Sequence, residues 1–275
     1  MSLIINTLIT ALLLWGPGPF PGSTFANPLW EDGKAEVCQY DAETVIYGKV
    51  RKHQITTIFV KEDFGTESKV KVDVSGSEKR VTAIKVHSVE KIESANYPYQ
   101  RARTTIASRT DLSALLRQTT SSQEWCGITS ARIVRSGDHF EHRWDSYFEG
   151  EPVGKEALPT DSITDHQLLL LARDFDFQEK KALEFTLLSG MESNKAGPLQ
   201  RRVARMTSSK EVDFTSPLGT THCRVVEVVC GDQLWMTLWV EVAQPHRIIG
   251  LDRFDGHKLR LRESKRWAYW QRVSR

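Results

Sequence analysis

The sequence predicts a mainly β protein in which a strongly curved antiparallel sheet, or an open barrel, wraps around one buried apolar helix. Short segments rich in β-branched and aromatic residues follow one another with turn residues between them, which is typical of antiparallel strands rather than of βαβ units. One apolar segment near the middle of the chain has the composition of a buried helix. Cavities between such a helix and its sheet are natural ligand sites.

The first 26 residues have the layout of a secretory signal peptide. The apolar run 3–15 is too short to cross a bilayer, which takes about 20 apolar residues. A stretch rich in glycine and proline follows, and small residues occupy Thr24 and Ala26, the positions that a signal peptidase reads. We therefore expect cleavage near Ala26 and a periplasmic or secreted mature protein.

The mature chain 27–275 is long enough for one β-rich domain with a self-sufficient core. We expect N-terminal strands over 34–149, a loop over 150–163, a helix at about 165–175 and a C-terminal meander over 181–270. The strands are expected at 35–47, 50–61, 70–74, 81–92, 97–107, 112–120, 125–134, 139–148, 183–188, 200–207, 222–229, 233–242, 247–253 and 258–270.

Local signals support the helix and the last hairpins. Thr164 and Gln167 have the spacing of a capping box, and four leucines in a row follow them, so the helix should be buried on several sides. Gly231-Asp232 and Asp255-Gly256 each separate two strand segments, and Asp-Gly between alternating strands is a strong hairpin signal.

Four cysteines in an exported chain make disulfides plausible. Cys223 and Cys230 flank a strand segment without turn residues, and their odd offset places the two thiols on opposite faces, so they should not pair. The open alternatives are a Cys38–Cys126 bond with two free thiols, or two bonds from the early to the late cysteines. We favour Cys38–Cys126.

The C-terminal part of the chain carries the candidate ligand-binding residues. From His246 to the end there are nine Lys or Arg against three Asp or Glu, which suggests an anionic partner or a solvated strand face. Lys258, Arg260 and Arg262 should share an outward face, and such cations can hold phosphate or carboxylate groups. Trp235 and Trp239 should share one face of the preceding strand, where they pack in the core or line an apolar cavity.

No segment has a convincing catalytic or metal-binding motif. Trp125-Cys126-Gly127 lacks the second cysteine of a redox motif, and the residues after it resemble a strand. His139 and His142 should point to opposite faces of a strand, and neither a HExxH motif nor a Gly-x-Ser-x-Gly motif is present. We predict no catalytic residues, no metal ligands and no cofactor. Export also argues against nucleic acid as a partner, and no mature segment has transmembrane length.

Several motifs between 30 and 150 resemble a group of uncharacterised exported bacterial proteins. They are Trp30-Glu-Asp-Gly-Lys-Ala-Glu, Tyr40, Tyr47-Gly48, Phe59-Val-Lys-Glu-Asp-Phe64, Tyr97-Pro-Tyr99, Ser121-Ser-Gln-Glu-Trp-Cys-Gly127 and Ser146-Tyr-Phe148. Some members carry the label "septum formation inhibitor", although such inhibitors are cytosolic α/β nucleotide pyrophosphatases. The resemblance therefore implies an exported β-rich fold and transfers no chemistry.

These observations favour a non-enzymatic exported protein that binds an amphipathic or lipid-like ligand, such as an anionic lipid, or a cell-envelope component. The alternatives are a hydrolase of envelope polymers, which would need a serine or a carboxylate pair converging in a cleft, and a structural or adhesive module without a pocket.

Overall fold

The computed structural model describes residues 20–74, 76, 78–150, 153–175, 182–191 and 195–271. The strands are β1 Ala35–Ile46, β2 Lys49–Gly65, β3 Arg80–Glu93, β4 Pro98–Ser108, β5 Asp111–Glu124, β6 Gly127–Ser136, β7 His139–Asp145, β8 Gly154–Pro159, β9 Ser162–Thr164, β10 Leu183–Ser189, β11 Gln200–Ser216, β12 Gly219–Cys230, β13 Gln233–Glu241, β14 Ile248–Arg253 and β15 Lys258–Trp267. The helices are α1 Ser23–Ala26, the 3₁₀ helix η1 Pro28–Glu31 and α2 Leu168–Asp174.

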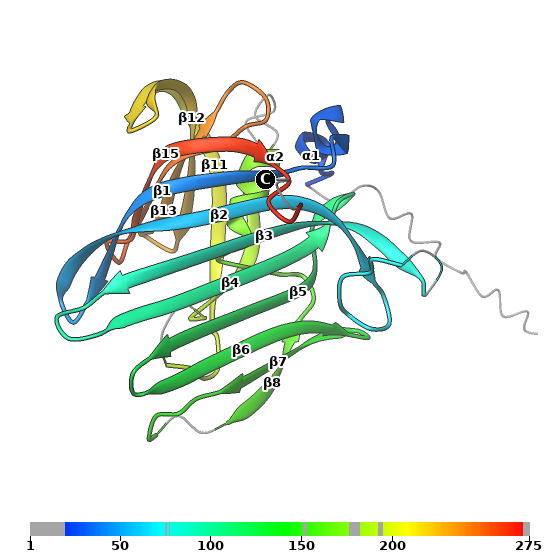
Figure 1. Ribbon diagram of the computed structural model, residues 1–275, viewed down its shortest axis with the longest axis vertical. Helices are drawn as coiled ribbons and strands as arrows, with labels where there is room; N and C mark the ends of the chain where they lie inside the picture. The colour runs from blue at the N-terminus through cyan, green and yellow to red at the C-terminus, as the bar shows by residue number, and fades with distance from the viewer. Residues whose placement is uncertain are drawn as a thin grey trace, which may run out of the picture.

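All 15 strands belong to one sheet in the order β8-β7-β6-β5-β4-β3-β2-β1-β15-β14-β13-β12-β11-β10-β9. Every pairing is antiparallel except that of β9 with β10. The sheet curves into a nearly closed, barrel-shaped wall, and β1 pairs with β15, so that the N-terminal and C-terminal halves of the chain are joined along one ladder (Figure 1). The predicted mainly β class and curved antiparallel sheet are confirmed.

The wall is closed along a seam of side-chain contacts between β8, the first strand of this order, and the start of β11, which lies two strands before the last. Glu156 of β8 accepts hydrogen bonds from the backbone N–H of Leu199 at 2.8 Å and from Arg201 Nη2 at 3.4 Å. His142 of β7 contacts the same carboxylate, with 3.1 Å between Nδ1 and Oε1. The prediction of a loop over 150–163 is wrong. β8 and most of β9 lie within that range, and Gly154 and Pro159 are the first and last residues of β8.

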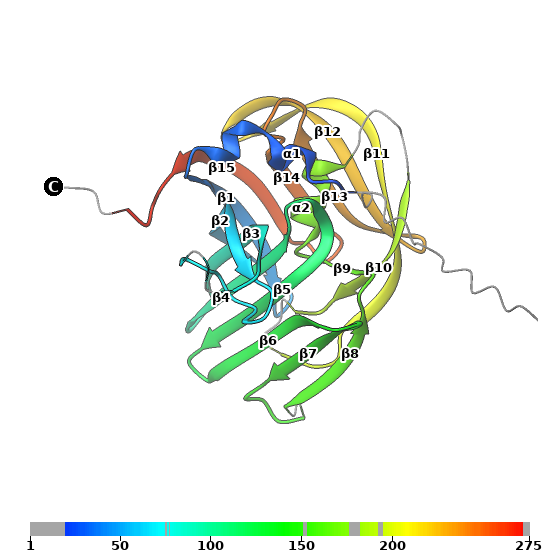
Figure 2. The same ribbon diagram turned by 90° about the vertical axis from the view of Figure 1, so that its right-hand side faces the viewer.

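The short helix α2 lies inside the curve of the sheet (Figure 2). All of its residues are buried, and its leucines belong to the main hydrophobic core. The expected capping box forms, because Thr164 and Gln167 exchange backbone-to-side-chain hydrogen bonds of 3.3 Å. The regular helix starts at Leu168, later than expected, because the first turn has hydrogen bonds to the third residue back. No described helix is long and apolar enough to span a membrane.

Replacing Leu170 by aspartate should severely destabilise the protein. Leu170 is fully buried in the main core, and an aspartate there would be a charge without a partner in an apolar site. We expect a drop of more than about 4 kcal/mol in the free energy of unfolding, measured by urea denaturation. The control is Leu218→Asp, at a residue that is 39% exposed and should tolerate the change. A Leu170→Asp protein as stable as the parent would show that burial of α2 contributes little to stability.

All four cysteines are free in the structure. Cys38 is buried in β1, with Sγ 3.5 Å from Ser264 Oγ, whereas Cys126 is exposed at the turn between β5 and β6. The expected Cys38–Cys126 disulfide is therefore absent from this structure. Cys223 lies in the middle of β12, and Cys230 is its last residue.

A candidate anion-binding pocket

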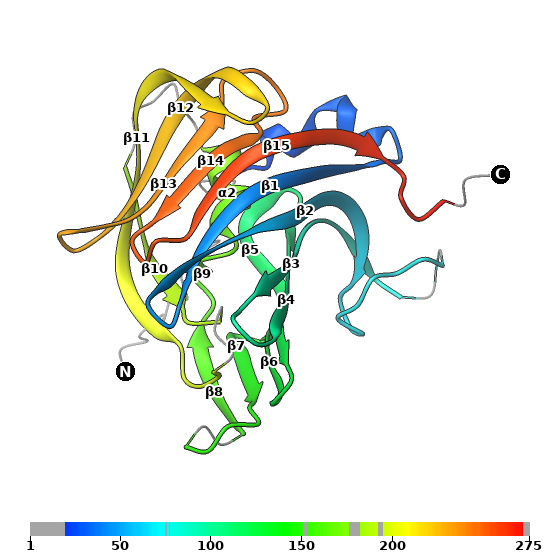
Figure 3. The ribbon, with the colours of Figure 1, turned by 60° about the vertical axis from the view of Figure 1, so that its left-hand side comes forward.

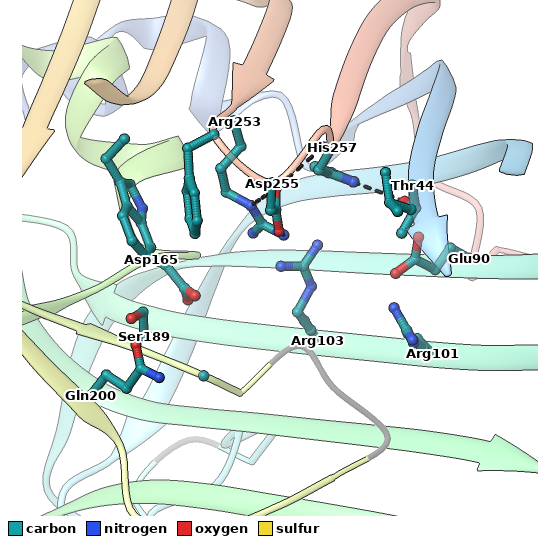
Figure 4. A pocket seen from close by; sticks show the side chains of 14 residues that line it. Thr44, Glu90, Arg101, Arg103, Asp165, Ser189, Gln200, Arg253, Asp255 and His257 are labelled. Atoms are coloured by element: carbon teal, nitrogen blue, oxygen red, sulfur yellow. Dashed lines mark hydrogen bonds and ion pairs between the residues drawn. The ribbon is translucent and has the colours of Figure 1, made fainter. Parts of the chain in front are cut away.

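A cavity of about 310 Å³ opens at one end of the barrel. Its walls come from strands that are far apart in sequence: the end of β1, β3, β4, the end of β10, the start of β11, β13, and the turn between β14 and β15 (Figure 3). Ten of its polar and charged lining side chains are labelled in Figure 4. The volume is in the range of small-molecule sites, and ten of the 14 lining residues are polar or charged.

Three arginines face this cavity. Arg101 and Arg103 stand two residues apart on β4, so they share its inner face, and Arg253 ends β14. In Figure 4, Arg103 extends from its strand toward Arg253. Arg253 is held in a fork by Asp255, at 2.9 and 2.7 Å. Burial lowers the pKa of both Arg101 and Arg103, which means that the site makes their positive charge costly.

Arg101 retains hydrogen-bonding capacity. Its Nε is buried and has no hydrogen-bond partner among the described residues. Its guanidinium group lies 5.6 Å from the centroid of the Tyr99 ring. A buried donor without an acceptor is unusual in a folded protein and is a position where a ligand oxygen can bind.

The acidic groups of the cavity differ in their partners. Burial alone would raise the pKa of Glu90, but a 2.8 Å hydrogen bond with His53 and the nearby arginine charges outweigh it and lower the pKa to about 2. Burial raises the pKa of Asp165, against the opposing effect of Arg253 and Arg103. Asp165 is therefore a weaker partner for the arginines than its position suggests.

His257 forms part of the same wall and is 5% exposed. Burial, followed by the charges of Arg253 and Arg103, lowers its pKa to about 3. Its Nδ1 lies 3.0 Å from Thr44 Oγ1. The imidazole is consequently neutral at physiological pH, and the fixed positive charge of the cavity comes from the arginines.

The cavity continues inward to a space of only about 20 Å³, bordered by Ser88 and His166. Thr105 donates to Gln118 Oε1 at 3.0 Å, so its oxygen accepts the Nδ1–H of His166 at 2.8 Å. The Nε2 of His166 then accepts the hydroxyl of Ser88 at 3.1 Å. His166 thus has its unprotonated nitrogen toward the serine hydroxyl, as a general base requires. The hydroxyl of Thr105 occupies the place that a carboxylate has in a catalytic triad. Burial, the largest effect, holds the pKa of His166 well below its ordinary value, which weakens it as a base.

The mouth of the cavity has an apolar side. Trp235 is buried and its ring centroid lies 4.1 Å from that of Phe254, which is 47% exposed. The Nε1 of Trp235 is buried and has no hydrogen-bond partner among the described residues. Val45 lines the same opening.

The structure separates Trp235 from Trp239, which the alternation of β13 placed on one face. Val228 pairs with Met236 and Val229 pairs with Leu234, so Trp235 is the extra residue of a β-bulge and turns into the cavity. Trp239 keeps the regular alternation and stacks on Phe214 at 4.4 Å.

The three expected cations lie on the outer face of β15, because Leu259 and Leu261 between them are buried. Each is near a carboxylate: Lys258 Nζ is 3.8 Å from Glu43, Arg260 Nη1 is 2.6 Å from Asp252 and Arg262 Nη2 is 2.6 Å from Asp41. None of them lines the cavity. Of the residues predicted from the sequence to bind a ligand, the structure brings only Trp235 into the pocket.

Arg101 and Arg103 were missed in the sequence. Two arginines at alternate positions of a predicted strand were the available signal. The opposite face of 98–107 has the more apolar residues, so a simple alternation pattern would place the arginines outside. Among the described residues, no group of three His, Cys, Asp or Glu side chains could hold a metal ion.

Comparisons with known proteins bear on the fold alone. A β-barrel-like protein of domain of unknown function DUF1849 from Brucella abortus superposes with a TM-score of 0.50, covering 85% of this chain and 98% of its own at 7% identity. A DUF1089 family protein from Pseudomonas aeruginosa gives a TM-score of 0.37 over 60% of this chain and 82% of its own, at 14% identity. No protein-family model and no curated protein matches the sequence. The Brucella abortus structure shows that the barrel-like fold of this chain also occurs elsewhere, and nothing in the comparisons supports the septum-inhibitor label.

Proposed function

We propose that this protein is an exported, non-enzymatic binder that holds the phosphate or carboxylate group of a small amphipathic molecule in the barrel-end pocket. The observation that carries the proposal is the pair Arg101 and Arg103, which project side by side into a cavity of about 310 Å³ with a buried, unpartnered Arg101 Nε. Arginine is suited to such groups because its fork matches their geometry and its charge persists at all physiological pH values.

Electrostatics support an anionic ligand. Asp255 is bound by Arg253, and burial raises the pKa of Asp165. Glu90, with its lowered pKa, is therefore the carboxylate that stays ionised beside Arg101 and Arg103. Desolvation makes these two charges costly in the empty pocket. A bound anion would offset that cost through charge-assisted hydrogen bonds, each of which contributes about 1.5–3 kcal/mol.

A row of aromatic side chains that begins beside Arg101 supports an apolar portion on the ligand. Tyr99, which lies under Arg101, donates a 3.0 Å hydrogen bond to Tyr47, and its ring is 5.5 Å from that of Tyr97. Tyr97 in turn stacks on Trp125 at 6.1 Å. Tyr47 and Trp125 are 75% and 77% exposed, which is high for large aromatic residues. The inner space of about 20 Å³ is too small for an alkyl chain, so we place the chain along this aromatic row.

The test compares inorganic phosphate with hexyl phosphate as probes in calorimetric titrations. We expect saturable binding of hexyl phosphate, with a weaker response to inorganic phosphate. The double variant Arg101→Ala/Arg103→Ala should weaken hexyl phosphate binding at least about tenfold, because two charge-assisted contacts are removed.

The matched control is Arg260→Ala/Arg262→Ala, which removes two arginines from the outer face of β15. It should leave binding within about twofold of the parent, because neither side chain lines the cavity. If this control loses binding while the pocket variant keeps it, the ligand binds to the outer basic strand and the pocket proposal is wrong. A parent protein that binds neither probe at low salt, where exposed charges attract most strongly, also refutes the proposal.

A hydrolase is the second candidate, favoured by the 3.1 Å contact of Ser88 Oγ with His166 Nε2. The inner space beside Ser88 leaves room for about one water molecule, so a substrate could reach the serine only after a rearrangement. A fluorophosphonate probe tests this directly, because it labels activated serines. Labelling that is lost in both Ser88→Ala and His166→Asn would establish the hydrolase, and an unlabelled protein would remove it.

A further inference from the structure

The residues just before the expected cleavage point are built into the core. Asp174, at the end of α2, accepts three hydrogen bonds from this segment: from Gly22 N at 2.7 Å, Ser23 Oγ at 2.9 Å and Thr24 N at 2.8 Å. Thr24 Oγ1 also donates to the carbonyl of Arg173 at 2.7 Å. One helix end thus depends on a segment about 150 residues away in sequence.

The same segment fills apolar space. Phe25 is fully buried, and its ring lies 4.8 Å from that of Trp30. Phe20 is 2% exposed, contacts the ring of Phe175, and its carbonyl accepts the backbone N–H of Leu112 at 3.0 Å. The side chains of Phe20 and Phe25 belong to the main hydrophobic core, so the segment is not a surface tail.

The backbone of the segment also packs closely against the turn at Arg109. Gly22 has a φ of 73°, and a Cβ at this position would lie 1.8 Å from the carbonyl oxygen of Arg109. Arg109 donates through Nε and Nη2 to the carbonyl of Phe25, at 2.9 and 2.8 Å. Only glycine fits that approach.

We propose that Phe20–Ala26 is a permanent part of the folded domain, and that any proteolytic removal of the apolar leader occurs before Phe20 rather than after Ala26. Cleavage at Ala26 would leave the Asp174 carboxylate buried without its three donors and would empty the space of Phe20 and Phe25. A buried charge without partners and a cavity are both strongly destabilising. The inference is independent of the ligand of the pocket.

The test has two measurements. Two proteins, starting at Phe20 and at Asn27, are compared by thermal unfolding, and the N-terminus of the exported full-length chain is determined by sequencing. We expect the Asn27 protein to melt at least about 10 °C lower or to fail to fold, and the exported protein to retain Phe20.

A full-length variant tests the close approach of Gly22 to Arg109 without shortening the chain. Gly22→Ala should lower the melting temperature clearly, because the added Cβ collides with the Arg109 carbonyl, whereas Pro21→Ala, at an exposed neighbour, should not. An exported protein that starts at Asn27, or an Asn27 protein that melts within about 2 °C of the Phe20 protein, would overturn the proposal.

Discussion

Replacing Arg173 by methionine should cost roughly 3–5 kcal/mol of folding free energy, the usual range for breaking a buried ion pair. The Arg173 side chain is fully buried and donates hydrogen bonds to both carboxylate oxygens of Glu36, at 2.7 and 3.1 Å. It also donates to the carbonyl of Pro245 at 2.8 Å and lies 4.5 Å from the centroid of the Phe59 ring. Removing it leaves Glu36 as a buried charge without its partner. The measurement is guanidinium chloride denaturation.

The control for Arg173 is Arg143→Met, which breaks the exposed fork with Glu141 and should cost less than about 1 kcal/mol. The double variant Arg173→Met/Glu36→Leu should recover much of the loss, because replacing both members of a buried pair by apolar residues is often neutral. If Arg173→Met proves as mild as the surface control, the buried pair contributes little to stability.

The β class and the closing hairpins were predictable because their signals are local. Asp255-Gly256 and Gly231-Asp232 form tight turns, with φ values of 86° at Gly256 and 57° at Gly231. These are conformations that glycine adopts without strain. The helix was predictable because a run of leucines after a capping box has no polar face to expose.

The closure of the barrel could not be predicted, because its determinants are far apart in sequence. The seam depends on Glu156 of β8 meeting Leu199 and Arg201, and these residues come together only when the whole sheet has curved. The short strands at the seam lie among glycines and prolines, which locally indicate a loop.

The residues that line the pocket could not be predicted from the sequence for related reasons. A β-bulge at Trp235 reverses the alternation on which the prediction for β13 relied, and a single extra residue leaves no clear mark in the sequence. Charge counts identified the basic C-terminal strand, but charge alone does not distinguish Arg260, which is paired with Asp252, from Arg101, whose Nε is buried without a partner among the described residues.

Acid should destabilise the protein well above the pH at which carboxylates titrate, through His257. Burial and the charges of Arg253 and Arg103 lower its pKa from 6.5 to about 3, against the opposing effects of Glu90 and Asp255. Below pH 6.5 this histidine binds a proton in the unfolded chain, whereas in the folded chain it binds one only near pH 3. Stability therefore falls as the pH decreases through this window, by roughly 3–5 kcal/mol in total and by about 2 kcal/mol at pH 5.

The contribution of His257 can be isolated between pH 7 and pH 5. Glu90, with a pKa lowered from 4.5 to about 2, contributes stability that is lost only as the pH falls from 4.5 toward 2. The pKa values of His166 and His142 are also lowered by burial, so part of the acid loss should remain in any single variant.

The variant His257→Asn keeps a polar group near Thr44 but cannot take up the proton. Its free energy of unfolding, measured by urea denaturation at pH 7, 6 and 5, should decline less steeply than that of the parent, by about 2 kcal/mol over this range. The control His139→Asn changes the first residue of β7, whose side chain is 44% exposed, and should follow the parent's profile. If His257→Asn loses stability as steeply as the parent, His257 takes up its proton in the folded protein at ordinary pH. The arginines would then share the pocket with a further cation below pH 6.5, and anion binding should strengthen in acid.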